Sequence, residues 1–134
     1  MQRLKTRAQF QAALAGKTVA KTAHFALHSC ALDAVMAVVP QGVSPLLFPI
    51  SGVWLGAMAP KRWAKRAVTR NAIKRQIYNV SAEFEHTLPQ HAHVVRLRAG
   101  FDRAQFLSAT SDKLKAAVRA ELQQLFARAG VPTP

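Results

Sequence analysis

The stretch from residue 53 to residue 84, VWLGAMAPKRWAKRAVTRNAIKRQIYNVSAEF, decides the fold because one periodicity gives way to another within it. Its opening part, residues 53–59, is an apolar run typical of a buried strand, and it ends at Pro60. From about residue 64 the apolar positions follow helical spacing and mark one face of an α-helix: Ile73, Ile77, Val80 and Phe84. The stretch therefore predicts a strand, a basic turn and a helix that packs through its isoleucines.

The turn and the helix carry a dense run of positive charge. Residues 61–75 hold seven Lys and Arg residues and no acid, and no acid occurs between Asp33 and Glu83. A solvated amphipathic helix gains support from acids that pair with its cations along the surface. Because this run lacks acids, we interpret it as a surface whose self-repulsion is relieved by a bound polyanion, with phosphate as the counter-charge.

The composition of the whole chain agrees with a folded basic protein. Its 134 residues carry 19 Lys and Arg against 6 Asp and Glu, a net charge of +13, while half are apolar. We expect a single domain over residues 1–134, with a Pro/Gly-rich loop at about 33–52. Cys30 is the only cysteine, which excludes an intrachain disulfide. No stretch has the pattern of a signal peptide or a spanning helix, so we expect a soluble cytoplasmic protein.

Local signals predict the other elements. Two helix starts carry the residues of a capping box, Thr6 with Gln9 and Asp102 with Gln105. Apolar and polar residues alternate, or β-formers gather, in three further segments that predict strands: residues 18–20, 24–30 and 93–98. The prolines and glycines of 33–52 predict irregular structure in that loop.

A resemblance to a known family rests on the motif Arg70-Asn71-Ala72-Ile73-Lys74-Arg75, which follows Lys61-Arg62 at the end of a strand. With these residues the chain resembles the bacterial ribonuclease P protein subunit. The likeness covers nearly the whole chain. Arg3-Leu4-Lys5 followed by Phe10 is similar to the family's opening, and residues 25–28 stand where its aromatic-bearing strand lies.

The resemblance implies an α/β fold, an α+β sandwich with the element order α-β-β-β-α-β-α. It implies a four-stranded, mostly antiparallel sheet and a left-handed βαβ crossover through the basic helix, against the general right-handed rule. It also implies two contacts with RNA. The basic helix should dock on the catalytic RNA through Lys61, Arg62, Arg66, Arg70, Asn71, Lys74 and Arg75. A cleft between the first helix and the sheet should hold the 5′ leader of precursor tRNA, and our candidates for it are Arg3, Lys5, Phe10, Phe25, His28, Arg96 and Arg98.

The function implied by the resemblance is that of the protein component of ribonuclease P. The RNA subunit would perform the Mg²⁺-dependent cleavage that gives the mature 5′ end of tRNA. The expected partners are ribonuclease P RNA and precursor tRNA, with no membrane and no protein partner. The distribution of acidic residues is consistent with catalysis by the RNA subunit. A two-metal nuclease needs clustered carboxylates, and the six acids of this chain are scattered along the sequence. We therefore expect no catalytic residue, metal or cofactor in the chain itself.

The residues also leave some questions open. Ala72 and Tyr78-Asn79 stand where the family usually has arginine and Arg-Glu. Trp63, beside the basic turn, either stacks on RNA or covers the start of the helix. The charge pattern alone also fits a ribosome-associated or ribosome-assembly RNA-binding protein with no processing role. It fits, further, a DNA-binding module whose helix enters a major groove, although helix-turn-helix spacing is lacking.

Overall fold

The structure, a computed structural model, describes residues 1–32, 38–39, 42–43, 48, 50–101 and 112–131. Along these residues the elements are β1 (Gln2–Arg3), α1 (Arg7–Ala15), β2 (Lys17–Lys21), β3 (Phe25–Ala31), β4 (Val38–Val39), β5 (Gly42–Val43), β6 (Trp54–Met58), α2 (Ala67–Glu83), β7 (His91–Leu97) and α3 (Asp112–Arg128). The predicted first helix, strands and basic helix are present near their predicted positions. The capping pair predicted at Asp102 and Gln105 lies outside the described residues.

A five-stranded sheet organises the fold, with the strand order β1-β6-β7-β3-β2. β6 is parallel to β1 and to β7, whereas β3 is antiparallel to β7 and to β2. The prediction of a four-stranded, mostly antiparallel sheet was therefore wrong, because the sheet is mixed and has a fifth strand. The implied crossover is present, since α2 joins the parallel neighbours β6 and β7. Its left-handedness stays a prediction.

The fifth strand escaped the sequence analysis because it is so short. Gln2 of β1 pairs with Trp54, and Arg3 pairs with Leu55. Two residues are too few for an alternating pattern to be recognised, and their partners lie far along the chain. β1 nevertheless makes β6 an interior strand, which agrees with the burial of Trp54, Leu55, Gly56 and Ala57.

The loop at 33–52 also departs from its prediction. Instead of being irregular throughout, it contains the antiparallel pair of β4 and β5, in which Val38 lies opposite Val43 and Val39 opposite Gly42. The prolines of this segment stand at positions 40, 45 and 49, so none of them removes a donor from the paired residues.

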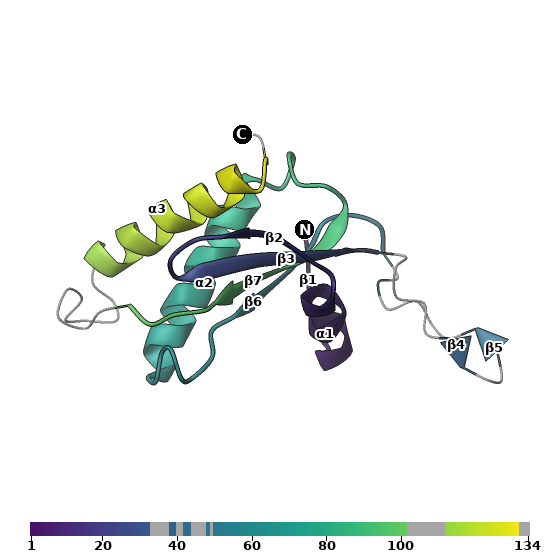
Figure 1. The fold of residues 1–134 in the computed structure, drawn as a ribbon, viewed down its shortest axis with the longest axis horizontal. Helices are drawn as coiled ribbons and strands as arrows, with labels where there is room; N and C mark the ends of the chain where they lie inside the picture. Colours follow the sequence, from purple (N-terminus) through teal and green to yellow (C-terminus); the bar gives the residue numbers. More distant parts are fainter. Residues whose placement is uncertain (33–37, 40–41, 44–47, 49, 102–111, 132–134) are drawn as a thin grey trace.

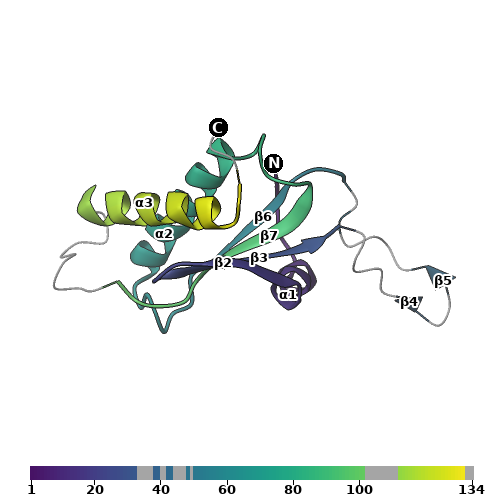
Figure 2. The ribbon, with the colours of Figure 1, turned by 45° about the horizontal axis from the view of Figure 1, so that its top comes forward.

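Helices pack on both faces of the sheet, and each face has its own core. Figures 1 and 2 show α2 and α3 on one side of the sheet and α1 on the other. Because side chains alternate along a strand, Phe25 and Leu27 enter the core beneath α2 and α3, whereas Cys30 enters the core beneath α1. Ile73 and Ile77 are buried in the first of these cores, which confirms the predicted packing face of the basic helix.

The position of α1 is fixed at both of its ends. At its start the predicted capping box is present: the Gln9 N–H donates to Thr6 Oγ1 over 3.2 Å, and the Thr6 N–H donates to Gln9 Oε1 over 3.1 Å. At its end Gly16 approaches β3 so closely that a Cβ atom would lie 2.2 Å from the Ser29 carbonyl oxygen. Only glycine therefore lets the chain turn from α1 into β2 at this distance.

Candidate nucleic-acid interface

The first candidate surface is the solvent side of α2 and the turn before it. We call it the α2 surface, and it consists of Lys61, Arg62, Arg66, Arg70, Asn71, Lys74 and Arg75. All of these residues are exposed except Arg70 and Lys74, which are half-buried. The sequence therefore identified residues that the fold brings together on one side of the molecule, because the helix buries its isoleucines and turns its cations outward.

Arg70 has a structural contact that the sequence analysis missed. Its Nη1 donates to the carbonyl oxygens of Ala64, at 3.1 Å, and Lys65, at 2.8 Å. These bonds tie the basic turn to the first turn of α2. Arg70 therefore fixes the position of its neighbouring cations.

The electrostatics at the start of α2 favour an anion. The N-cap residue Arg66 makes no side-chain capping bond, and the first turn holds no acid. The unpaired N–H groups and the positive end of the helix dipole thus add to the charge of the side chains. Together they form a surface suited to phosphate, in which arginine side chains can hold two oxygens at once.

Arg3 lies beside α2, although it was predicted in the cleft. Its guanidinium carbon is 4.0 Å from the centroid of the Tyr78 ring. Arg3 pairs with Leu55, which faces the core beneath α2, so its side chain lies on that side of the sheet. The structure thus brings a cation to Tyr78. Sequence patterns did not predict this placement, because the strand β1 that carries Arg3 has only two residues.

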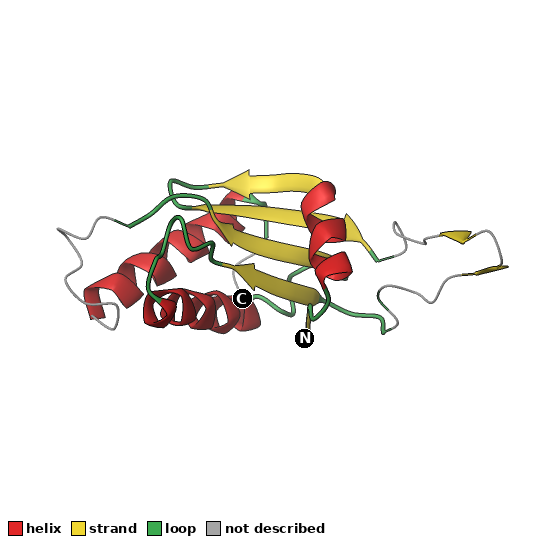
Figure 3. Cartoon of the chain, turned by 90° about the horizontal axis from the view of Figure 1, so that it is seen from below, coloured by secondary structure: helices red, strands yellow, loops and turns green. Residues whose placement is uncertain are grey.

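The second candidate surface lies on the opposite face of the sheet. Figure 3 shows α1 crossing one end of the strands, and no other helix of the described residues lies on this face. We call this the α1-side surface, and it consists of Phe10, Thr18, Lys21, His28, Arg96 and Arg98. Thr18 and Lys21 were not predicted, but their pairing with His28 and Ala26 places them on the same face as those residues.

His28 is the centre of a small polar network on the α1-side surface. Arg96 donates from Nε to His28 Nε2 over 3.4 Å, and His28 Nδ1 lies 3.2 Å from Thr18 Oγ1. Since a guanidinium can only donate, Nε2 accepts and Nδ1 carries the proton. Burial, with the charges of Arg96 and Lys21, holds the pKa of His28 below its ordinary value. The neutral ring is 7% exposed, so it holds Arg96 and is too buried to stack on a base.

Phe10 forms a wall of the α1-side surface next to the sheet. A Cβ atom at Gly56 would lie 2.5 Å from Phe10 Cε1 and 2.9 Å from Leu4 Cδ1, so β6 has a glycine where α1 packs closest. Phe10 is half-buried and keeps part of its ring accessible. Its packing against β6 anchors α1, and its role in a leader cleft stays a prediction.

Phe25 is the candidate that the structure contradicts. It is fully buried in the core beneath α2 and α3, on the face opposite to His28. The two residues are three positions apart on one strand, so the period of two puts them on opposite faces. Phe25 therefore cannot share a cleft with His28. Lys5 is exposed at the start of α1, where its N–H donates to Gln9 Oε1 over 2.7 Å.

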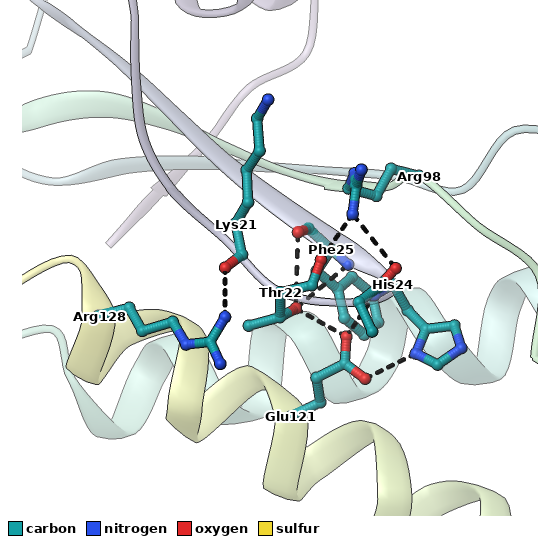
Figure 4. A network of polar contacts seen from close by, with 8 residues as sticks. Lys21, Thr22, His24, Phe25, Arg98, Glu121 and Arg128 are labelled. Carbon is teal, nitrogen blue, oxygen red and sulfur yellow. Dashed lines mark hydrogen bonds and ion pairs between the residues drawn. The ribbon is translucent and has the colours of Figure 1, made fainter.

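The turn between β2 and β3 is held by a polar network (Figure 4). Glu121 of α3 accepts hydrogen bonds from Thr22 Oγ1 and the His24 N–H, both at 2.7 Å, and its other oxygen lies 2.7 Å from His24 Nδ1. Arg98 donates to the Thr22 carbonyl over 2.8 Å and Arg128 to the Lys21 carbonyl over 2.9 Å. This network fixes the strand end that carries Lys21.

We expect Glu121→Gln to lower the free energy of unfolding by about 2 kcal/mol, since hydrogen bonds to a charged group contribute about 1.5–3 kcal/mol. Burial acts to raise the pKa of Glu121, but the bonds from Thr22 and His24 outweigh it and lower the pKa below 4.5. The contribution of Glu121 to the free energy of unfolding should therefore be fully present above pH 4.5. It should be lost as the pH drops through the lowered pKa. Urea unfolding between pH 3 and 7 measures this, and the variant should lose part of the acid dependence. An unchanged acid dependence would contradict the assignment.

Three acids of the described residues make structural contacts. Glu83 of α2 binds Arg119 of α3, Glu85 binds the amino group of Met1, and Glu121 binds His24. In the described part of the chain no three His, Cys, Asp or Glu side chains gather as metal ligands would. None of the helices described is both long and apolar enough to cross a bilayer.

Comparisons with known proteins point to one family. The family model for Ribonuclease P matches residues 1–129. The ribonuclease P protein component of Bordetella petrii is 33% identical over 126 residues, covering 94% of this chain and 89% of that protein. The counterpart from Bordetella bronchiseptica is also 33% identical, over 128 residues with the same coverage. The Staphylococcus aureus RNase P protein has the same fold, with a TM-score of 0.68, 20% identity, and coverage of 98% of this chain and 97% of that one.

Proposed function

Since this chain belongs to the ribonuclease P protein family, we propose that its two basic surfaces divide the binding of RNA in that enzyme between them. The chain is the protein component of ribonuclease P, a tRNA 5′-processing endoribonuclease, and its partner is ribonuclease P RNA. Membership of the family decides against the ribosomal and DNA-binding alternatives. The proposal concerns how the residues of this chain perform that role.

The α2 surface docks on ribonuclease P RNA. This assignment rests on the concentration of exposed cations around an uncapped helix start, where acids are lacking in the first turn. Contacts of this kind bind phosphate and fix orientation without reading sequence. Arg3 extends the surface across β1, because it lies against Tyr78 of the same helix.

The α1-side surface receives the 5′ leader of precursor tRNA. The supporting observation is a sheet face on which Arg96 and Lys21 lie near a neutral histidine, and on which α1 is the helix found among the described residues. Arg98 adds a cation at the β2–β3 turn. An extended single strand presents phosphates at regular intervals, which these cations can bind, while the accessible part of Phe10 offers an apolar contact to a base. We include Lys5, which is exposed just before the start of α1, as a further cation for the leader.

The chemistry of cleavage belongs to the RNA subunit in this proposal. Glu83, Glu85 and Glu121 are engaged by positively charged or imidazole groups of the protein, which supports assigning the metal ions to the RNA. Metal ions held by RNA phosphates then perform the hydrolysis, and the protein positions the two RNAs. The α2 surface and the α1-side surface lie on opposite faces of one sheet, so a rigid body links the RNA subunit to the leader.

The salt dependence of binding tests the docking surface. The α2 surface carries six cations, so we expect about six phosphates to be neutralised. The slope of log affinity for ribonuclease P RNA against log salt concentration should then be about −4 to −5. Filter binding between 50 and 400 mM salt measures the slope. A slope near zero would contradict an electrostatic dock.

A further inference from the structure

Trp63 lies within the basic turn that leads into α2, and its side chain is exposed. Its neighbours on both sides are cations: Lys61 and Arg62 precede it, and Lys65 and Arg66 follow closely. The residue is 37% exposed, whereas the other tryptophan, Trp54, is 5% exposed and donates from Nε1 to the Ile50 carbonyl. A large aromatic ring is thus accessible in the most positively charged part of the chain.

The backbone of Trp63 is held rigidly from three directions. The N–H groups of Trp63 and Ala64 both donate to the Pro60 carbonyl, at 3.1 and 3.2 Å. Arg70 binds the carbonyl oxygens of the next two residues from α2. Gly100 lies so close on the third side that a Cβ atom there would be 3.1 Å from the Trp63 carbonyl oxygen. Because the backbone is fixed, only side-chain freedom remains to be lost when the ring binds a partner.

The ring already takes part in one stacking contact. The guanidinium carbon of Arg62 lies 5.2 Å from the centroid of the indole, which is within the range of a cation–π interaction. Among the described residues, Arg62 is the one that stacks on the Trp63 ring. An exposed indole with a neighbouring arginine matches what an unpaired nucleotide offers, because a base stacks on an aromatic face while a guanidinium binds the adjoining phosphate.

We propose that Trp63 stacks on an unpaired base of ribonuclease P RNA, while Arg62 binds a phosphate beside it. This inference rests on the proposed function of the α2 surface and adds a contact that does not depend on charge. Stacking on Trp63 would place the turn against a single-stranded nucleotide of the RNA. The dock would then recognise a local RNA structure as well as phosphate.

The test measures affinity for ribonuclease P RNA and its salt slope in three variants of the full chain. We expect Trp63→Leu to weaken binding by about 5- to 100-fold, the range found when a base loses its aromatic partner. The salt slope should be unchanged, because no phosphate contact is removed. Trp63→Phe should bind within about threefold of wild type. Arg75→Gln, which removes one exposed cation of the α2 surface, should instead make the slope shallower by about 0.7–0.9.

Val68→Ala provides the matched control. Val68 is the other exposed large apolar residue at the start of α2, with 50% exposure, and it lacks a ring. The variant loses apolar surface at a neighbouring position, so its affinity should stay within twofold of wild type. Equal losses for Val68→Ala and Trp63→Leu would assign the effect to general apolar contact and overturn the stacking proposal.

Fluorescence tests the contact in the unaltered protein. Acrylamide should quench Trp63 readily in the free chain and several-fold less in the complex, with Trp63→Phe giving the contribution of buried Trp54. The proposal is overturned if Trp63 stays as accessible in the complex as in the free chain, or if Trp63→Leu binds like wild type. A steep wild-type salt slope with either result leaves the docking function standing, whereas a flat slope removes that function itself.

Discussion

Reversing the charge of Arg66 and Arg75 together should lower the affinity for ribonuclease P RNA by about 1,000-fold. Both residues are exposed on the α2 surface. Each substitution to Glu replaces a phosphate attraction of about 1 kcal/mol with a repulsion of similar size, so the two positions together cost about 4 kcal/mol. Filter binding at 100 mM salt measures the loss. The salt slope should also become shallower by about 1.4–1.8, since two phosphate contacts are removed.

The fold should survive this double change. Arg66 is the N-cap of α2, where a carboxylate is favourable because it faces the positive end of the helix dipole. Reversing Lys113 and Lys115 is the matched control, because both are exposed on α3, outside the two proposed surfaces, and the net charge changes equally. That control should bind within about fivefold of wild type. Equal losses in both double variants would show that net charge, and not the α2 surface, governs binding.

Arg96→Gln should weaken the reconstituted enzyme's binding of precursor tRNA by about 10- to 100-fold and leave mature tRNA binding within twofold. The guanidinium is oriented by its bond to His28 and remains partly accessible on the α1-side surface. Loss of one charge-assisted bond to a leader phosphate costs about 1.5–3 kcal/mol. Mature tRNA has no leader, so its binding provides the internal reference.

Arg128→Gln separates leader contact from support of the hairpin. Arg128 is exposed on α3 and donates to the Lys21 carbonyl, so this variant also removes a guanidinium near the β2–β3 turn. It should lower stability by about 1 kcal/mol without changing the preference for precursor over mature tRNA. If Arg96→Gln keeps its fold and weakens the binding of precursor and mature tRNA equally, the assignment of this surface to the leader is wrong.

The parts of the fold that local patterns encode could be predicted from the sequence. The capping box of α1 was recognised because its partners, Thr6 and Gln9, are three residues apart. The packing face of α2 followed from the spacing of Ile73, Ile77 and Val80, which also placed the cations outward. In both cases the structural consequence depends on neighbours within a few turns of chain.

Pairings between distant residues could not be predicted. Arg3 lies on Tyr78, and Glu121 binds Thr22 and His24, although nothing in the local sequence connects these positions. The parallel pairing of β1 with β6 depends on two residues and adds the fifth strand to the sheet. Phe25 is a different case. The alternation of a strand already separates it from His28, so that signal was present in the sequence and was not applied.

The most direct test of the central claim is reconstitution at low Mg²⁺. Ribonuclease P RNA, the purified chain and precursor tRNA should together release the 5′ leader at a Mg²⁺ concentration where the RNA alone is nearly inactive. The chain alone should leave the transcript intact at every Mg²⁺ concentration, because its role is to position RNA. Cleavage by the purified chain without the RNA subunit, or equal rates with and without the chain, would contradict the account.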